Sequence, residues 1–134
     1  MNALSLPDVS PQELASFKAH RREIIDATHQ KVLQIFDFST LLGENYEELV
    51  YNGIVNTAKI FETVMQVSFA NLMDQQLDWA KDYFPNIGIP SEIVLKEIEI
   101  FAAELDKRLP AREYPGLAAW MDMMVQIQKK IVEH

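Results

Sequence analysis

The chain is predicted to fold as a single all-α domain of four to six helices. Three observations carry this prediction. Apolar residues recur at the three- and four-residue spacing of an amphipathic helix. No useful length of sequence alternates with period two, as a half-buried strand would. Helix-start signals recur at Ser10, Asn45, Ser91 and Pro115, each just before a helical pattern.

The composition indicates one globular domain over residues 1–134, with an extended lead at 1–9. The chain has 134 residues, of which 49% are hydrophobic and 24% are charged. A chain of this size and composition buries a core without covalent cross-links. It has no cysteine, which excludes disulfides, thiolate metal sites and thiol nucleophiles.

The first helix is expected to follow Ser10, which caps a helix that has Pro11 at its first position. Glu13, three residues after Ser10, completes a capping box. An apolar stripe at helical spacing then continues through Leu14, Phe17, Ile24, Ile25, Thr28, Val32, Ile35 and Phe36. We expect the helix to end near 38–42, with Gly43 as a left-handed residue at its C-terminal end.

The second helix is expected to follow Asn45, with Glu48 three residues on as the partner in the cap. Residues 60–73 are apolar on more than one side, which predicts a central helix enclosed by its neighbours. A helix through the whole proline-free stretch would exceed the usual length in globular proteins. We therefore expect a bend or break, either at 53–57 or at 68–71.

The turn formers at 85–90 predict a firm stop before the last two helices. Ser91 and Glu92 open the third helix, and Pro110 closes it. Pro115 begins the fourth helix. Short connections between long helices favour antiparallel neighbours, as in a helical bundle, and a globin-like packing of the same helices is the alternative.

A globin-like fold raises the question of haem, which needs an axial histidine in the later half of the chain. No histidine lies between Gln30 and Glu133. A globin-like version of this fold is therefore haem-free, and we expect no cofactor.

The net charge of −8 disfavours nucleic-acid binding, because phosphate contacts need a surplus of lysine and arginine. The densest basic cluster, at 18–22, is too short to bind a phosphate backbone. The most apolar window is interrupted by Glu62, Gln66 and Asn71, so no membrane span is predicted. The first residues lack the basic and apolar regions of a signal peptide. We expect a cytoplasmic protein.

The best metal candidate is a run of four residues spaced by three: His20, Glu23, Asp26 and His29. Neighbouring pairs in the run share a helix surface. Over the full run the direction turns by about 180°, so the four cannot converge on one ion. A di-iron bundle needs a second histidine motif, and the remaining histidine is His134. A solvated polar face is the favoured interpretation.

Other carboxylates offer no clearer site. Asp74, Asp78 and Asp82 form a ladder on one helix face, which supplies too few oxygens for calcium. Glu97 and Glu104 would act as paired acid and base only if they faced each other across a pocket, which their spacing on one helix cannot show. No nucleophile elbow or glycine-rich phosphate loop is present. We expect no catalytic residues and no metal, so the chain is predicted not to be an enzyme.

Aromatic and methionine side chains are numerous on helices that should meet, and their default role is to fill the core. The alternative is an apolar cavity for a fatty acid or a similar ligand. The predicted lining of that cavity is Phe61, Met65, Phe69, Phe101, Trp120 and Met124. Tyr51, Asn56 and Gln66 would then supply the polar contacts that orient a headgroup.

The segment 72–79, with its glutamines and tryptophan, leads through the turn at 84–90 to the helical pattern at 91–109. This arrangement resembles the end of haem-free globin-like sensor domains of the N-terminal stress co-sensor type, found ahead of bacterial stress-signalling modules. It also resembles the helical segments that precede cobalamin-binding domains in some regulators. Pro90 precedes Ser91 here, where the resemblance leads us to expect the reverse order. The resemblance implies a sensory or regulatory role and transfers no functional residue.

Together these patterns predict a non-catalytic signal-sensing or protein-interaction module of a bacterial regulatory system. We expect it to pair with a second copy of itself or with a partner signalling protein. The predicted dimer surface is Leu117, Trp120, Met124 and Ile131, on one edge of the fourth helix. Two alternatives are an apolar-ligand-binding or granule-coating helical protein and a carboxylate-metal enzyme.

Overall fold

The structure, a computed structural model, describes residues 8–67, 75, 81 and 88–133. The described part of the chain contains five helices and no strand. The helices are α1 (Pro11–Ile35), α2 (Phe38–Leu42), α3 (Tyr46–Val67), α5 (Ser91–Arg108) and α6 (Pro115–Glu133). The predicted all-α class is confirmed.

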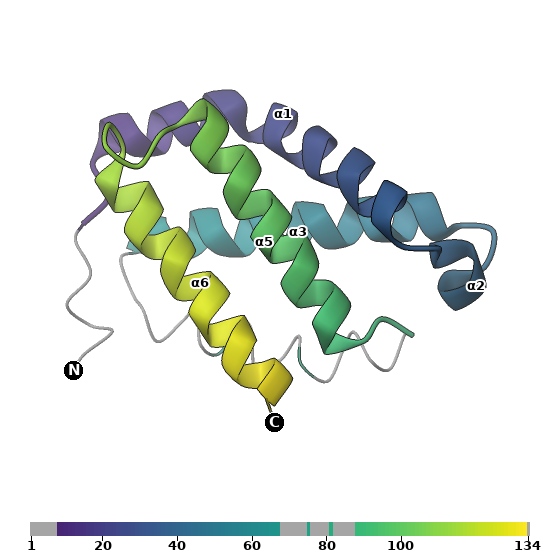
Figure 1. The fold of residues 1–134 in the computed structure, drawn as a ribbon. Coiled ribbons are helices and arrows are strands. Elements are labelled where there is room, and N and C mark those ends of the chain that lie inside the picture. Colours follow the sequence, from purple (N-terminus) through teal and green to yellow (C-terminus); the bar gives the residue numbers. More distant parts are fainter. Residues whose placement is uncertain (1–7, 68–74, 76–80, 82–87, 134) are drawn as a thin grey trace.

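The helices form two pairs whose members run in opposite directions (Figure 1). The first pair is α1 and α3, which are joined through α2. The second pair is α5 and α6, and α5 crosses over α3 at a steep angle. Helix α5 also packs against α1, and this contact joins the second pair to the first. This arrangement is consistent with the predicted helical bundle.

Helix α1 begins at the predicted cap and ends earlier than predicted. The backbone N–H of Glu13 donates to Ser10 Oγ at 3.0 Å, and the N–H of Ser10 donates back to Glu13 Oε1 at 3.3 Å. The helix stops at Ile35 because Phe36 is extended, with φ −120° and ψ 144°. A separate helix, α2, then starts at a new cap, where Asp37 Oδ1 accepts the N–H of Ser39 at 3.2 Å. The expectation of one helix reaching 38–42 was therefore wrong.

Two predictions concern the residues that follow α2: Gly43 at its C-terminal end and Asn45 at the start of the next helix. Gly43 lies at the C-terminal end of α2 with φ 82°, the positive angle that favours glycine, although its ψ of −159° lies outside the left-handed helical region. Helix α3 begins directly after Asn45, as predicted. The N–H of Leu49 donates to the Asn45 carbonyl at 3.1 Å, which continues the helical hydrogen bonds back to that residue.

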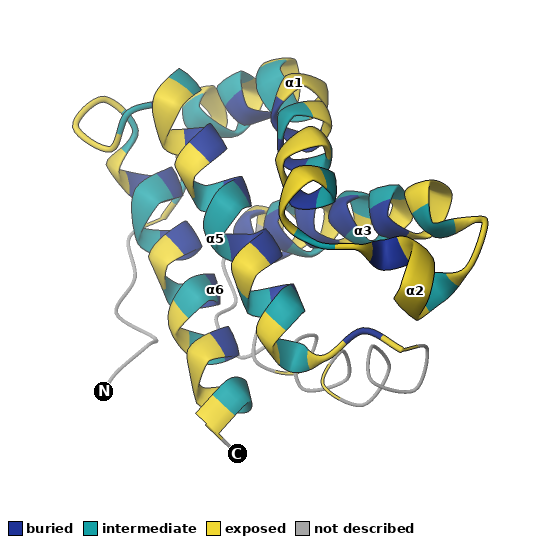
Figure 2. Ribbon diagram, turned by 45° about the vertical axis from the view of Figure 1, so that its right-hand side comes forward, coloured by how far each residue is buried: buried dark blue, intermediate teal, exposed yellow. Residues whose placement is uncertain are grey.

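Helix α3 is continuous through 53–57, so no break lies at the first of the two alternative positions. The second, at 68–71, lies outside the described residues. Buried side chains of α3 fall on a single stripe, which consists of Val50, Ile54, Thr57, Ala58, Phe61, Val64 and Met65. Asn52, Asn56, Lys59, Thr63 and Gln66 are exposed on the other side (Figure 2). The expectation that this helix is enclosed all round is wrong for its described part, and the remainder, 68–73, lies outside the described residues.

One carboxylate ties the starts of two helices together. Glu13, which closes the cap of α1, also accepts the backbone N–H groups of Gly116 at 2.9 Å and Leu117 at 3.3 Å. These groups belong to the first turn of α6, whose donors have no partner within the helix. The negative charge also stabilises the positive end of the α6 dipole. Glu13 thereby fixes the start of α6 against the start of α1.

Three aromatic rings stack edge to face through the centre of the domain. The Phe17 and Phe61 centroids are 5.2 Å apart with the rings at 77°, and the Phe61 and Phe101 centroids are 6.4 Å apart at 76°. The rings come from α1, α3 and α5, and all three are fully buried. Edge-to-face pairs of this kind contribute roughly 1 kcal/mol beyond their burial. This stack holds the two helix pairs together.

Candidate functional site

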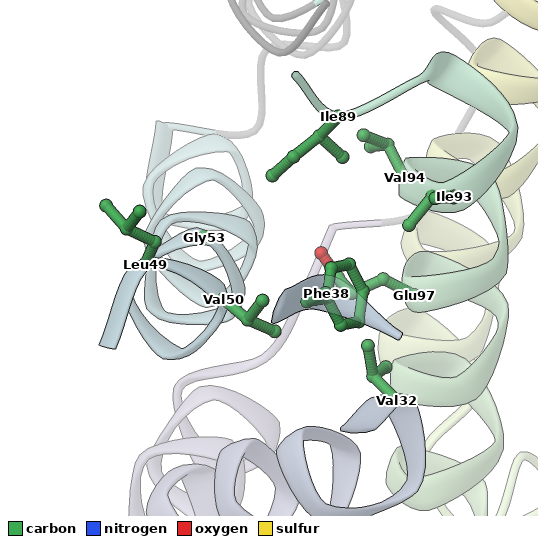
Figure 3. A pocket seen from close by; sticks show the side chains of 9 residues that line it. All are labelled: Val32, Phe38, Leu49, Val50, Gly53, Ile89, Ile93, Val94 and Glu97. Atoms are coloured by element: carbon green, nitrogen blue, oxygen red, sulfur yellow. The ribbon is translucent and has the colours of Figure 1, made fainter. Parts of the chain in front are cut away.

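An apolar pocket lies where α1, α2, α3 and α5 meet (Figure 3). Its described lining is Val32, Phe38, Leu49, Val50, Gly53, Ile89, Ile93, Val94 and Glu97. The hollow has about 320 Å³ of empty space, counting the part that opens to solvent. Its cavity volume is about 30 Å³, and roughly 10–15 Å³ by this measure holds one water molecule. The cavity is therefore small.

Glu97 is the ionisable residue of this lining, and its side chain enters the pocket from α5. Figure 3 shows the apolar side chains of α2, α3 and α5 facing one another, with an oxygen of Glu97 among them. The residue is 8% exposed. Its Oε1 accepts a hydrogen bond from Thr57 Oγ1 at 2.8 Å. Its Oε2 is buried and has no hydrogen-bond partner among the described residues.

Burial raises the pKa of Glu97 to about 8, because an ionised carboxylate is poorly solvated among hydrocarbon side chains. The hydrogen bond from Thr57 favours the ionised form, but it offsets only part of this effect. The carboxyl group is therefore mostly neutral at pH 7. An unpaired polar atom in such a place costs about 1–3 kcal/mol, and buried groups of this kind are uncommon in native proteins.

Local sequence explains why Glu97 faces inward. It lies three residues after Val94 and four before Phe101, both of which are buried on the apolar face of α5. Thr57 is placed opposite by the buried stripe of α3. Its hydroxyl has one hydrogen and lies 3.3 Å from the Gly53 carbonyl as well. When that hydrogen is donated to Glu97, the contact with Gly53 is left unmade.

A second buried glutamate, Glu104, lies two turns further along α5 in a very different setting. Its side chain is 3% exposed. Lys31 and Lys107 donate to Oε2, the latter at 3.1 Å, and Arg108 donates to Oε1 at 2.9 Å. Burial alone would raise the pKa of Glu104, but the hydrogen bonds from Lys31, Arg108 and Lys107 lower it to about 2. Both oxygens are occupied, so Glu104 acts as a tie between α1 and α5.

The predicted pocket residues lie elsewhere. Phe61, Met65, Phe101, Trp120 and Met124 are buried in the core, and none of them belongs to the described lining of the pocket at Glu97. The sixth predicted residue, Phe69, lies outside the described residues. The predicted polar contacts are also elsewhere. The Tyr51 hydroxyl donates to Asp26 at 3.0 Å, and Asn56 and Gln66 are exposed.

The predicted dimer surface needs a similar correction. Leu117, Trp120 and Met124 are buried in the core of the chain itself, because α6 turns its apolar edge toward the other helices. Ile131 is half-buried. These four residues therefore present no apolar face to a second copy. The exposed large apolar side chains described are Ile35 at 51%, Leu41 at 42% and Leu49 at 42%, all near α2.

The four residues proposed as metal candidates on α1 have separate partners. His20 Nδ1 lies 3.0 Å from the Ser16 carbonyl, and His29 Nε2 lies 3.0 Å from the Glu47 carbonyl. Glu23 pairs with Arg108 at 3.4 Å, and Asp26 accepts from Tyr51. Among the described residues, no group of three histidine or acidic side chains is arranged to hold a metal ion. The aspartate ladder at 74, 78 and 82 lies outside them.

Sequence reasoning considered Glu97 only as a partner for Glu104 and did not connect it with a pocket. The signal was its position within the apolar stripe of α5. In the described part of the chain, no helix is both long and apolar enough to cross a membrane. No family model, curated protein or solved structure matches the chain.

Proposed function

We propose that this chain is a non-catalytic sensing module that binds a small molecule with an apolar body in the pocket between α1, α2, α3 and α5. The observation that carries this proposal is the unpaired Oε2 of Glu97, buried among described lining residues that are otherwise apolar. Ligand sites combine apolar walls with a few polar groups that fix orientation. A buried acceptor with no partner is a group that a ligand can satisfy.

The residues of the pocket favour ligand binding over catalysis. Glu97 is the one ionisable residue of the described lining, and Thr57 beside it supplies a single hydroxyl. Nucleophilic catalysis by a hydroxyl and a base also needs a third group that orients the base, and no described residue contacts Glu97 Oε2 in that way. The resemblance to sensor domains of bacterial regulatory systems agrees with a binding role.

Helix α2 offers a route from the pocket to the outer surface. Phe38 of this five-residue helix lines the pocket, and Leu41 of the same helix is exposed. Leu49 connects the pocket with the outer surface, because it lines the pocket and is 42% exposed. A ligand that binds one position of α2 better than another shifts the population toward that position. A partner protein in contact with Leu41 or Leu49 would respond to the shift.

The test is amide chemical-shift mapping by NMR while hexan-1-ol is added. We expect perturbations at α2, at the first turns of α3 and at the first turns of α5. Val50→Phe, which fills the pocket, should abolish them. Val55→Phe, the same change at a half-buried position of α3 outside the described lining, should leave them in place. Perturbations centred on Trp120 and Met124, or none at all, would overturn the proposal.

Self-association is a second candidate, favoured by the exposed apolar side chains Ile35, Leu41 and Leu49. They come from the end of α1, from α2 and from the start of α3. We propose that a second copy covers this end of the molecule, since exposed apolar side chains near one another are typical of interfaces. Light scattering should then show a dimer that Leu41→Glu converts to a monomer. A wild-type monomer at millimolar concentration would contradict this candidate.

A further inference from the structure

The pocket at Glu97 also restricts the chemistry of its ligand. Its described lining offers one open polar atom, Glu97 Oε2, and no lysine, arginine or histidine. We propose that the ligand is a small primary amine with an apolar tail, whose ammonium group pairs with Glu97. This inference rests on the proposed function, because it names the ligand class of the same pocket.

The space and the donors fit an ammonium group. The cavity volume of about 30 Å³ is enough for a compact group such as an ammonium, since roughly 10–15 Å³ by this measure holds one water molecule. An ammonium has three hydrogens to donate and accepts none, which matches an open carboxylate oxygen. Thr57 already holds Oε1 at 2.8 Å and so fixes the orientation of the carboxyl group. The apolar side chains of the lining, Leu49, Ile93 and Val94 among them, are suited to a hydrocarbon tail.

The charges around the pocket favour an amine over a fatty acid. The carboxylate of a fatty acid would meet no cation among the described lining residues, and it would face the Glu97 carboxyl group. The chain as a whole carries a net charge of −8, which attracts cations and repels anions. Charged groups on the surrounding helices do not replace the missing cation. Lys31, Asp37, Lys59 and Lys96 are exposed, and none of them belongs to the described lining.

Charged side chains near the pocket already have partners other than Glu97. Lys31 of α1 donates to Glu104, which also holds Lys107 and Arg108. Asp37, at the start of α2, accepts from Ser39 at 2.6 Å and Thr40 at 3.1 Å. Glu97 receives its one hydrogen bond from Thr57, and no ion pair to it is formed by the described residues. Among the described residues, none supplies a cation to Glu97.

Pairing with an amine moves one proton out of the pocket. A primary alkylamine titrates near pH 10.4, as the lysine side chain does, and so arrives as an ammonium ion at pH 7. Glu97 is mostly neutral at that pH. When the ion pair forms, the O–H bond of the Glu97 carboxyl group breaks and its proton passes to the buffer. Each ligand bound near pH 7 should release close to one proton.

The same proton balance gives the pH dependence. Below about pH 8 the ammonium competes with the proton on Glu97, so its affinity should rise about tenfold per pH unit. Between about pH 8 and pH 10 the affinity should level off, because Glu97 is then ionised without the ligand. An alcohol of the same length binds the neutral carboxyl and should show no rise over this range. The carboxylate ion of the same length should bind weakly throughout.

The experiment is calorimetric titration of the full chain with n-hexylamine, hexan-1-ol and hexanoate at pH 7, in two buffers of different ionisation enthalpy. We expect n-hexylamine to bind with release of about one proton per site. Glu97→Gln preserves the size of the side chain and removes its charge, so it should weaken amine binding at least about tenfold and leave the alcohol unaffected. Glu92→Gln, an exposed acidic residue in the first turn of α5, is the matched control and should change neither.

The outcomes separate this inference from the proposed function. If hexan-1-ol binds the pocket and n-hexylamine does not, or if the amine binds without proton release, the inference is wrong and the proposed function stands. If neither compound binds, both are wrong and Glu97 is a structural carboxyl group. Proton release is measured on the unsubstituted chain, so the inference stays testable even if Glu97→Gln does not fold.

Discussion

Glu97 and Glu104 lie two turns apart on α5, and both are almost fully buried, yet their ionisation is opposite. Glu97 has a pKa raised to about 8 and one oxygen without a partner, whereas Glu104 has a pKa lowered to about 2 and both oxygens engaged. The difference comes from the helices that face them. Glu97 meets Thr57 and hydrocarbon, and Glu104 meets Lys31 together with two cations of its own helix.

This comparison shows that burial alone does not determine the role of an acidic residue. Glu104 links α1 to α5 through charged hydrogen bonds that together compensate for its removal from water. Glu97 makes one hydrogen bond and remains largely uncompensated, which is what leaves it open to a ligand. Glu104 therefore stabilises the fold, whereas Glu97 lowers its stability at the proposed binding site.

The largest expected effect is the pH dependence of stability caused by Glu97. An unfolded glutamate titrates near pH 4.3, and folded Glu97 titrates near 8. Between these values the folded protein holds a proton that the unfolded chain has lost. The unfolding free energy therefore falls as pH rises from about 4.3 to about 8 and then levels off. At pH 8 Glu97→Gln should be more stable than the unsubstituted chain by on the order of 4 kcal/mol.

Urea denaturation of the two proteins from pH 5 to pH 9 measures this difference. The gap between their unfolding free energies should widen from pH 5 to about pH 8 and then level off, and Glu99→Gln on the same helix should not reproduce it. A gap that is independent of pH would show that Glu97 is ionised in the folded protein throughout.

The matched substitution Glu104→Gln should have the opposite sign. It removes the charge that Lys31, Lys107 and Arg108 share, and each of these cations remains partly exposed and can be solvated. The cost should therefore be about 2 kcal/mol at pH 7, toward the lower end of the range for a broken buried pair. Thermal unfolding at pH 7 checks the sign, and an unchanged or raised midpoint would contradict the role of Glu104 as a tie.

The contribution of Glu104 should also depend on pH in the opposite direction. Because its folded pKa lies near 2, below the unfolded value of about 4.3, its stabilising effect is complete above about pH 4.3. The effect is lost as pH falls toward 2. Glu104→Gln and the unsubstituted chain should therefore converge in stability in acid, while they differ at neutral pH.

The smallest expected effect concerns Thr57, which holds Glu97 Oε1. Thr57→Val has nearly the same shape and removes the hydroxyl donor. It should destabilise the fold by about 1 kcal/mol at pH 6 and raise the pKa of Glu97 further, because the ionised form loses its hydrogen bond. Thr63→Val, at an exposed position of the same helix, serves as the control. If Thr57→Val lowers the pKa of Glu97, this account of the hydrogen bond is wrong.

Much of the fold could be predicted because its signals are local. The capping box at Ser10 and Glu13 and the start at Pro115 depend on neighbouring residues, and both were predicted correctly. The end of α1 was missed although the Asp37 cap is local too, since it lies inside an apolar stretch without proline or glycine. Asp37 with Ser39 two residues on is the signal that could have found it.

The candidate site depends on contacts that no local pattern contains. The periodicity of α5 places Glu97 and Glu104 on its buried face, but their partners Thr57 and Lys31 lie 40 and 73 residues away in the chain. The dimer surface on α6 failed for a related reason. An apolar stripe such as Leu117 to Met124 predicts that something covers it, and it does not distinguish the same chain from a second copy.

The central claim is that Glu97 is a neutral carboxylic acid in an apolar pocket at neutral pH. A ¹³C NMR titration of its side-chain carboxyl carbon, assigned by its loss in Glu97→Gln, tests this most directly. The account predicts a titration midpoint near pH 8, with the folded state confirmed at each step from the amide spectrum. A midpoint near pH 4 would show a glutamate that is ionised at neutral pH, and it would contradict both the predicted proton release and the predicted pH dependence of stability.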